Sequence, residues 1–184
     1  MSSVAPAIRG DTRARILATA LELIAEKGFA ATSTRELSER LGFTKAALYY
    51  HFRTKEDLLV ALVEPGVQQL RDLLRQATST ERAGRRQLLD GYITVVIDNL
   101  DLTRVISQEP ALGRIERLTR LSVPLYEQLI RRLLGREQAD ASELACAHVA
   151  LGGIHAALLN HAPGADLRDV RRGAFAAACG ALGI

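Results

Sequence analysis

The sequence predicts an all-α protein, and three observations support this fold class. Alanine, leucine and arginine dominate the chain, and these residues favour helices over strands. Strictly alternating runs of Val, Ile and Thr are missing, so no strand is expected. Apolar residues recur instead at the three- and four-residue spacing of an amphipathic helix. The first such stripe comprises Ile16, Leu17, Ala20, Leu21 and Ile24.

The first 60 residues predict an arm followed by short helices. Residues 1–10 are expected to form a flexible arm, and residues 11–27 a first helix. Gly28 follows, in the position where a helix often ends in the left-handed conformation. Thr54 is expected to cap a fourth helix that begins at Lys55.

Between these helices the sequence predicts a helix-turn-helix. Ser33 with Glu36 three residues later is typical of a capping box, which opens a second helix that ends at Gly42. Thr44 is the expected N-cap of a third helix over residues 45–51. Two short helices joined by a tight turn that contains glycine are typical of this motif.

Residues 61–184 predict a second, helical domain. Pro65-Gly66 is expected to interrupt the fourth helix or to let a related helix restart through Leu70, Leu73 and Leu74. Pro124 is expected to kink or break a later helix. The polar residues 77–84 predict a loop. Helical patterns cover residues 85–100, 112–134, 142–161 and 167–182.

The phase of the third helix predicts which residues face outward. Leu48 and Phe52 are four apart, so both can face the core. Three ring side chains in a row on so short a helix cannot all be buried, and exposed rings beside a lysine suit phosphates and base edges. The small side chains of Ala46 and Ala47 would let the helix approach the floor of a DNA groove. The residues turned outward are Lys45, Ala46, Tyr49, Tyr50 and His51.

Lys55 is a second indication of nucleic-acid binding. It lies in the first turn of a helix, where the helix dipole disfavours a cation and favours an anion. A DNA phosphate at this helix end would explain the lysine. The alternative is that Lys55 pairs with Glu56 or Asp57 on a solvated face.

Residues 12–60 resemble the N-terminal domain of the TetR family of bacterial regulators. The matching segments are Thr32–Leu37, Leu41–Lys45, Leu48–Phe52 and Lys55–Leu59. Two mild departures are Ala46, where a glycine is common, and Leu37-Ser38 in place of Ile-Ala. The resemblance implies an N-terminal three-helix DNA-binding domain (residues 11–60) and a C-terminal helical domain (residues 61–184) for effector binding and dimerisation. It also implies a DNA-contacting set of Thr34, Arg35, Thr44, Lys45, Ala46, Ala47, Tyr49, Tyr50, His51 and Lys55.

A dimer is expected because one helix-turn-helix covers only one half-site of DNA. Residues 142–161 are apolar all round, with large residues on one side and small ones on the other. The large side suits the core, and the small side suits the close approach of a partner helix. The resemblance implies an interface built from the last two helices; the alternative is that the small residues pack within one subunit. The interface candidates are Ala145, Val149, Gly152, Gly153, Ala156, Phe175 and Cys179.

A ligand site would need an apolar cavity with a few polar groups. His148 and His155 are seven residues apart and share a helix face, so they could bind a ligand or sense pH. The alternative is that both are satisfied core or interface residues. The candidates for the site are Tyr92, Asn99, Gln108, Tyr126, His148 and His155.

Composition and absent motifs argue against several classes of protein. No apolar run reaches roughly 18 residues and the N-terminus lacks an apolar signal core, so a cytoplasmic protein without membrane contact is expected. Cys146 and Cys179 lack metal-like spacing and are expected to be buried thiols. Motifs of hydrolases, nucleotide-binding proteins and zinc proteases are missing, so neither an enzyme, a cofactor nor a metal is expected.

The sequence therefore predicts a homodimeric, sequence-specific repressor that a small-molecule effector releases from a palindromic DNA operator. The alternative is a helical protein-interaction module that has lost DNA binding. Strong salt dependence of DNA binding would separate the two, because phosphate contacts weaken as salt rises.

Overall fold

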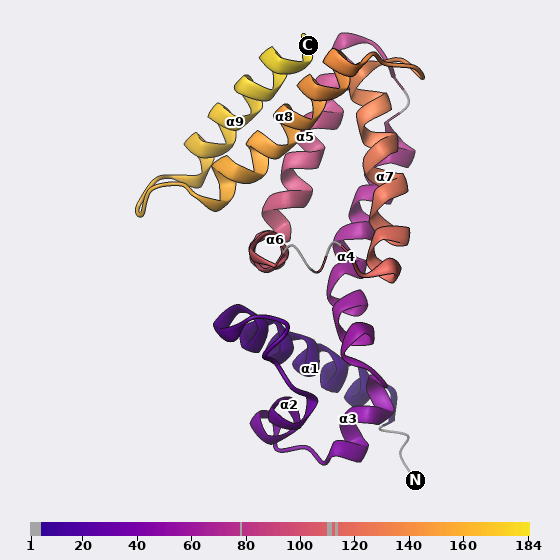
Figure 1. Cartoon of the computed structure of the whole chain (residues 1–184), viewed down its shortest axis with the longest axis vertical. Coiled ribbons are helices and arrows are strands. Elements are labelled where there is room, and N and C mark those ends of the chain that lie inside the picture. The colour runs from indigo at the N-terminus through magenta and orange to yellow at the C-terminus, as the bar shows by residue number, and fades with distance from the viewer. Residues whose placement is uncertain (1–4, 78, 110–111, 113) are drawn as a thin grey trace.

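The fold is all-α, as predicted. A computed structural model describes residues 5–77, 79–109, 112 and 114–184, with side chains from Thr12 onward. Within these residues it contains nine α-helices and no strand (Figure 1). The helices are α1 (Ala5–Lys27), α2 (Thr34–Leu41), α3 (Lys45–His51), α4 (Lys55–Gln76), α5 (Arg82–Asp98), α6 (Leu100–Gln108), α7 (Glu116–Leu134), α8 (Ala141–Leu159) and α9 (Leu167–Leu182).

The helices form two units joined by α4. In Figure 1, α1, α2 and α3 cluster around the start of α4, and we call this group the N-terminal unit. The rest of α4 packs with α5 and α7, and α8 and α9 pack side by side; these helices with α6 form the C-terminal bundle. Helix α6 is seen end-on between the two units and contacts α1 as well as α8. Because α4 and α6 each reach both units, a movement in one unit can be transmitted to the other.

Each unit has its own core, and a third apolar cluster joins them. The N-terminal unit buries Ile16, Leu48 and Phe52 together. The joining cluster includes Ile24 of α1 and Val105 of α6, together with residues of α4 and α7. Apolar burial therefore stabilises the contact between the units as well as each unit.

The N-terminal helix is longer than the sequence indicated. Residues 5–10, predicted as part of a flexible arm, belong to α1, and residues 1–4 lie outside the described residues. A proline at position 6 is compatible with this start, because the first helical turn does not require its N–H.

Neither internal proline breaks its helix, so the interruption expected at Pro65 is wrong and, of the kink or break expected at Pro124, the break does not occur. Helix α4 continues through Pro65, and α7 continues through Pro124. A proline inside a helix costs about 3 kcal/mol through one lost hydrogen bond and a steric clash. Both prolines are solvent-exposed, and long buried faces on the same helices offset that cost. The predicted boundary at residue 60 consequently falls inside a continuous helix.

Helix α6 was missed by the sequence analysis. The predicted helix over residues 85–100 ends earlier, at Asp98, and Asn99 separates it from α6. Leu102 and Val105 supply the buried stripe of α6 at a three-residue spacing. The signal was present, but the helix is short and no side-chain N-cap announces it.

Helix α8 corrects two expectations. By length and composition it could cross a membrane, although no such run was expected; the core helix of a soluble bundle passes the same test. Here Leu151 and Ile154 lie on a buried stripe that packs into the bundle. Cys146 was expected to be buried but lies on the opposite face and is exposed, whereas Cys179 of α9 is buried as expected.

Candidate functional site

Side-chain caps define where the two helices of the helix-turn-helix begin, at the residues that the sequence predicted. The Ser33 hydroxyl accepts a hydrogen bond from the Glu36 N–H (3.2 Å), and the Thr44 hydroxyl accepts one from Ala47 (3.1 Å). Gly42 ends α2 with a φ of 67°, where glycine avoids the strain of a side chain. Only half of the expected capping box forms, because the Glu36 carboxylate pairs with Lys27 instead.

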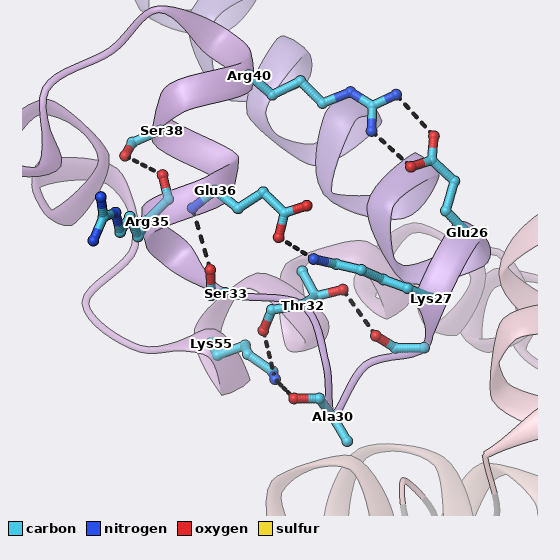
Figure 2. A network of polar contacts seen from close by, with 11 residues as sticks. Glu26, Lys27, Ala30, Thr32, Ser33, Arg35, Glu36, Ser38, Arg40 and Lys55 are labelled. Carbon is cyan, nitrogen blue, oxygen red and sulfur yellow. Dashed lines mark hydrogen bonds and ion pairs between the residues drawn. The ribbon is translucent and has the colours of Figure 1, made fainter.

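Ion pairs fasten α2 to α1, as Figure 2 shows. Arg40 donates two hydrogen bonds of 2.8 Å to the carboxylate of Glu26, which lowers the pKa of Glu26. The Thr32 hydroxyl donates to the Gly28 carbonyl at 2.8 Å and closes the loop between the helices. The position of α2 is thus set by polar contacts as well as by the core.

The outward face of α3 carries the expected ring side chains. Leu48 is 1% exposed and Phe52 4%, whereas Tyr49 is 47% and Tyr50 70% exposed. The ring of His51 meets that of Tyr50 edge-on, with centroids 5.4 Å apart. Solvent-exposed aromatic rings on so short a helix offer stacking and hydrogen-bonding groups that no contact within the fold requires. Lys45, Ala46 and Ala47 are exposed beside them.

The other predicted DNA contacts take several positions. Arg35 is exposed on α2 and pairs with Glu39 at 2.8 Å, which raises its pKa. Thr34 is half-buried at the start of α2, and the Thr44 side chain is used as a helix cap. Arg35 could exchange its exposed, weak partner for a phosphate.

Lys55 takes a position that the sequence did not indicate. Its ammonium group donates to the backbone carbonyls of Ala30 (3.1 Å) and Thr32 (2.8 Å), as Figure 2 shows. It also lies 4.3 Å from the centre of the Phe29 ring. Burial lowers its pKa. The lysine therefore holds the loop between α1 and α2, and because its ammonium group is engaged there we do not expect it to contact a phosphate.

The alternative pairing of Lys55 with its acidic neighbours is replaced by other contacts. Asp57 accepts a hydrogen bond from the Thr54 N–H, which completes a capping box at the start of α4. The same carboxylate pairs with Arg117 of α7 at 2.5 Å. Arg117 is the main cause of the lowered pKa of Asp57. The start of α4 is thereby tied to the C-terminal bundle.

Two cations near the motif were not among the predicted site residues. Arg13 lies 5.5 Å from the centre of the Phe52 ring, and Arg15 lies 5.6 Å from that of Phe43. Both belong to α1 and are exposed, so they place positive charge beside the helix-turn-helix. Their charge was visible in the sequence, but their position depends on how α1 crosses the motif.

Comparison with known proteins agrees with this architecture. The family model of bacterial regulatory proteins of the tetR family matches residues 16–62. The TetR-like transcriptional regulator of Rhodococcus sp. RHA1 superposes with a TM-score of 0.70 at 18% identity, over 99% of this chain and 100% of that one. The regulator PfmR of Thermus thermophilus gives 0.68 at 23% identity, over 91% and 97%. The N-terminal part of the chain thus matches the TetR family model, and the whole chain shares its fold with TetR-like regulators.

Sequence likeness to curated TetR-family relatives is concentrated in the N-terminal part. The class C tetracycline repressor of Escherichia coli is 48% identical over 52 residues, which cover 28% of this chain and 24% of the repressor. The uncharacterized regulator YvkB of Bacillus subtilis is 30% identical over 129 residues, 67% of this chain and 64% of YvkB. This chain spans less than two thirds of the length of each of these relatives.

An open, mostly apolar pocket of about 160 Å³, called the cavity below, lies among α4, α5, α6, α7 and α8. It brings together Tyr92, Asn99 and His155 of the predicted ligand site. Gln108 instead lines a separate, open hollow beside the end of α8, which His155 also borders. The remaining two candidates, Tyr126 and His148, pair with each other, with ring centroids 6.0 Å apart. The structure thus brings together half of the predicted set.

Tyr92 and His155 are joined by a hydrogen bond of 2.9 Å between the phenol oxygen and Nε2. Burial raises the pKa of Tyr92 and lowers the pKa of His155, so both groups are held in their neutral forms. The pair adds polar atoms to a lining that also includes Asn99, Thr103 and Ser122.

The predicted dimer face of α8 is exposed. Val149 is 68% exposed, and a Cβ at Gly152 or Gly153 would meet nothing within 4 Å. Phe175 of α9 is half-buried, and Cys179 is only 4% exposed because it faces the bundle core. We therefore leave Cys179 out of the candidate interface. The remaining exposed candidates are Ala145 and Ala156.

Proposed function

We propose that this protein is a sequence-specific, DNA-binding transcriptional regulator that acts in the cytoplasm as a homodimeric repressor. The exposed ring surface of α3 carries the proposal. A side chain as large as Tyr50 gains nothing from 70% exposure within the fold, whereas it is suited to an external polar surface.

In the proposed complex, α3 enters the major groove. Ala46 and Ala47 allow close approach and can contact thymine methyl groups, while Tyr50 reaches base edges. Lys45, Tyr49 and His51 contact the flanking phosphates, joined by Thr34 and Arg35 of α2. Position and exposure in the structure support these roles, since every one of these residues is on or beside the outward surface.

The second copy in a dimer supplies a second DNA-binding unit for the other half-site of the operator. The exposed small residues of α8 allow close helix approach, and two copies related by a two-fold axis would match a palindromic operator. The 68% exposure of Val149 supports this, because a partner helix would cover this apolar side chain.

The effector is a small molecule bound in the cavity of the C-terminal bundle. We propose that its binding moves α6 and thereby lowers operator affinity, with a coupling free energy of about 1–3 kcal/mol. Helix α6 supports this route because it lines the cavity and also contacts α1. Among relatives, the tetracycline repressor is named a repressor and FasR of Mycolicibacterium smegmatis an activator. We propose repression, as the sequence analysis did.

Selection of bound duplexes from a random pool at physiological salt tests the proposal. We expect enrichment of a short palindrome, and a Lys45→Met variant with the same fold should enrich it less strongly. Enrichment of no sequence by a well-folded dimer would contradict sequence-specific regulation. Enrichment of a single, non-palindromic half-site would contradict the dimeric arrangement.

A further inference from the structure

We propose that the cavity ligand is a small, uncharged, mostly apolar molecule, about one aromatic ring in size, with one hydrogen-bond donor. The inference rests on the proposed function only in treating that ligand as the effector. Whether such a molecule binds the cavity can be measured without DNA.

Pocket volume sets the scale of the ligand. The volume is about 160 Å³. An engineered apolar cavity of about 150 Å³ binds benzene. A single ring with one small substituent therefore matches the pocket, and a larger molecule would project into solvent through its open side.

The lining excludes a charged ligand. Val67, Leu70, Val96, Leu102 and Leu125 supply much of the surface, and none of the described residues that line the cavity is acidic, lysine or arginine. Burial lowers the pKa of His155 and so favours its neutral form. An ion buried among these side chains would lose its hydration without gaining a counter-charge, which is strongly unfavourable.

The hydrogen bonds that the polar lining groups already make within the protein determine which donors and acceptors remain for a ligand. Asn99 donates from Nδ2 to Gln69 (2.6 Å) and to the Val95 carbonyl (2.8 Å). The Thr103 hydroxyl donates to the Asn99 carbonyl, and the Ser122 hydroxyl donates to the Leu118 carbonyl, each at 2.9 Å.

Each of these donors is therefore occupied within the protein. A hydroxyl that donates its proton still has lone pairs that can accept. The lining consequently offers several acceptors, and the Tyr92–His155 pair retains one N–H or O–H. A ligand that carries an O–H or N–H therefore finds an acceptor in this lining.

Titration calorimetry of the full-length protein without DNA tests the proposal with four probes of similar size. Phenol is neutral and donates a hydrogen bond, and toluene has no polar group. Benzoate and benzylamine are charged. We expect phenol and toluene to bind, and the two ions to give no saturable binding. Binding of benzoate or benzylamine as tight as that of phenol would overturn the proposal, as would a lack of phenol binding.

Variants locate the binding in the cavity. Val96→Phe fills the cavity and should abolish binding of phenol and toluene, whereas Val123→Phe on the exposed side of α7 should not. If Val96→Phe fails to fold, the double variant Thr103→Val, Ser122→Ala is the second test. It removes two acceptors with little change of volume, so it should weaken phenol binding roughly tenfold and leave toluene binding unchanged. Unchanged phenol binding in both variants would show that phenol binds elsewhere.

Adding phenol to the protein–operator complex separates this proposal from the proposed function. Binding of phenol to the free protein without release of the operator would leave the ligand class standing and contradict effector-driven release. Absence of any operator would contradict the regulatory function without altering the calorimetric result.

Discussion

The carboxylate of Glu109 accepts a hydrogen bond from the backbone N–H of Phe29, which joins the end of α6 to the loop that leads into the helix-turn-helix. The approach is close: a Cβ on Gly28 would lie 2.5 Å from Glu109 Oε1. Lys55 donates to carbonyls of the same loop. The loop is therefore held by one residue from each unit.

Replacing Glu109 should loosen this loop. A hydrogen bond to a charged group contributes roughly 1.5–3 kcal/mol, so Glu109→Ala should increase hydrogen exchange of the Phe29 amide about tenfold or more. Glu109→Gln can still accept the bond and should retain most of the protection. The Leu48 amide in α3 serves as an internal reference that should not change. Equal exchange at Phe29 in all three proteins would exclude a stabilising role for the contact.

Lys55 and Lys45 should differ in what they stabilise. Lys55→Met removes two hydrogen bonds and the contact with the Phe29 ring, so urea unfolding should show a loss of about 1–3 kcal/mol with an unchanged salt dependence of DNA binding. Lys45→Met, at an exposed position, should leave stability nearly unchanged and lower the salt slope by about one. A lower salt slope for Lys55→Met would instead indicate that Lys55 contacts a phosphate, as the sequence predicted.

Tyr50→Ala should change which operators are preferred more than it changes stability. The side chain is 70% exposed, so the free energy of unfolding should stay within about 0.5 kcal/mol. Selection from a random duplex pool should recover a motif with relaxed preference at one position in each half-site. If the variant weakens every duplex by the same factor, Tyr50 contacts only the backbone of the DNA.

Local signals predicted the N-terminal unit well because its elements are fixed by short-range chemistry. The caps at Ser33, Thr44 and Thr54, the left-handed turn at Gly42, and the outward phase of Tyr50 all follow from neighbours in sequence. Long-range contacts were not accessible in the same way. The carbonyls bound by Lys55 lie more than 20 residues away, and no local pattern encodes them.

The C-terminal bundle was less predictable for the same reason. Pro65 was expected to end a helix, but packing across the whole length of α4 outweighs the local penalty. The ligand candidates were chosen by residue type, whereas the cavity is defined by where five helices leave space. Tyr92 and His155 therefore meet, while Tyr126 and His148 pair with each other.

The proposed dimer interface can be tested with two valines. Val149→Asp places a charge at the centre of the exposed face of α8, and burying it against a second copy would be unfavourable. Sedimentation should therefore show a monomer, with operator binding reduced at least tenfold. Val123→Asp, at a valine that is 45% exposed on α7, is the matched control and should remain dimeric. A dimeric Val149→Asp protein would exclude this face.

Acidification should weaken the C-terminal bundle through His155. Burial lowers the pKa of His155 in the folded state, whereas the unfolded value is about 6.5. Below that value the unfolded chain binds a proton that the folded protein does not, so stability is complete above about pH 6.5 and falls as the pH drops toward the folded pKa. Thermal unfolding at about pH 7.5 and about pH 5.5 should show this loss, and His155→Gln should reduce it.

The nearby groups provide a control for that measurement. Arg104 and His161 border the same open hollow as His155, and Tyr92 is bonded to its Nε2. His161 is thus a second histidine at this hollow, and its replacement is the matched control. His161→Gln should therefore keep most of the pH dependence. If His161→Gln removes it and His155→Gln does not, the buried histidine is not its source.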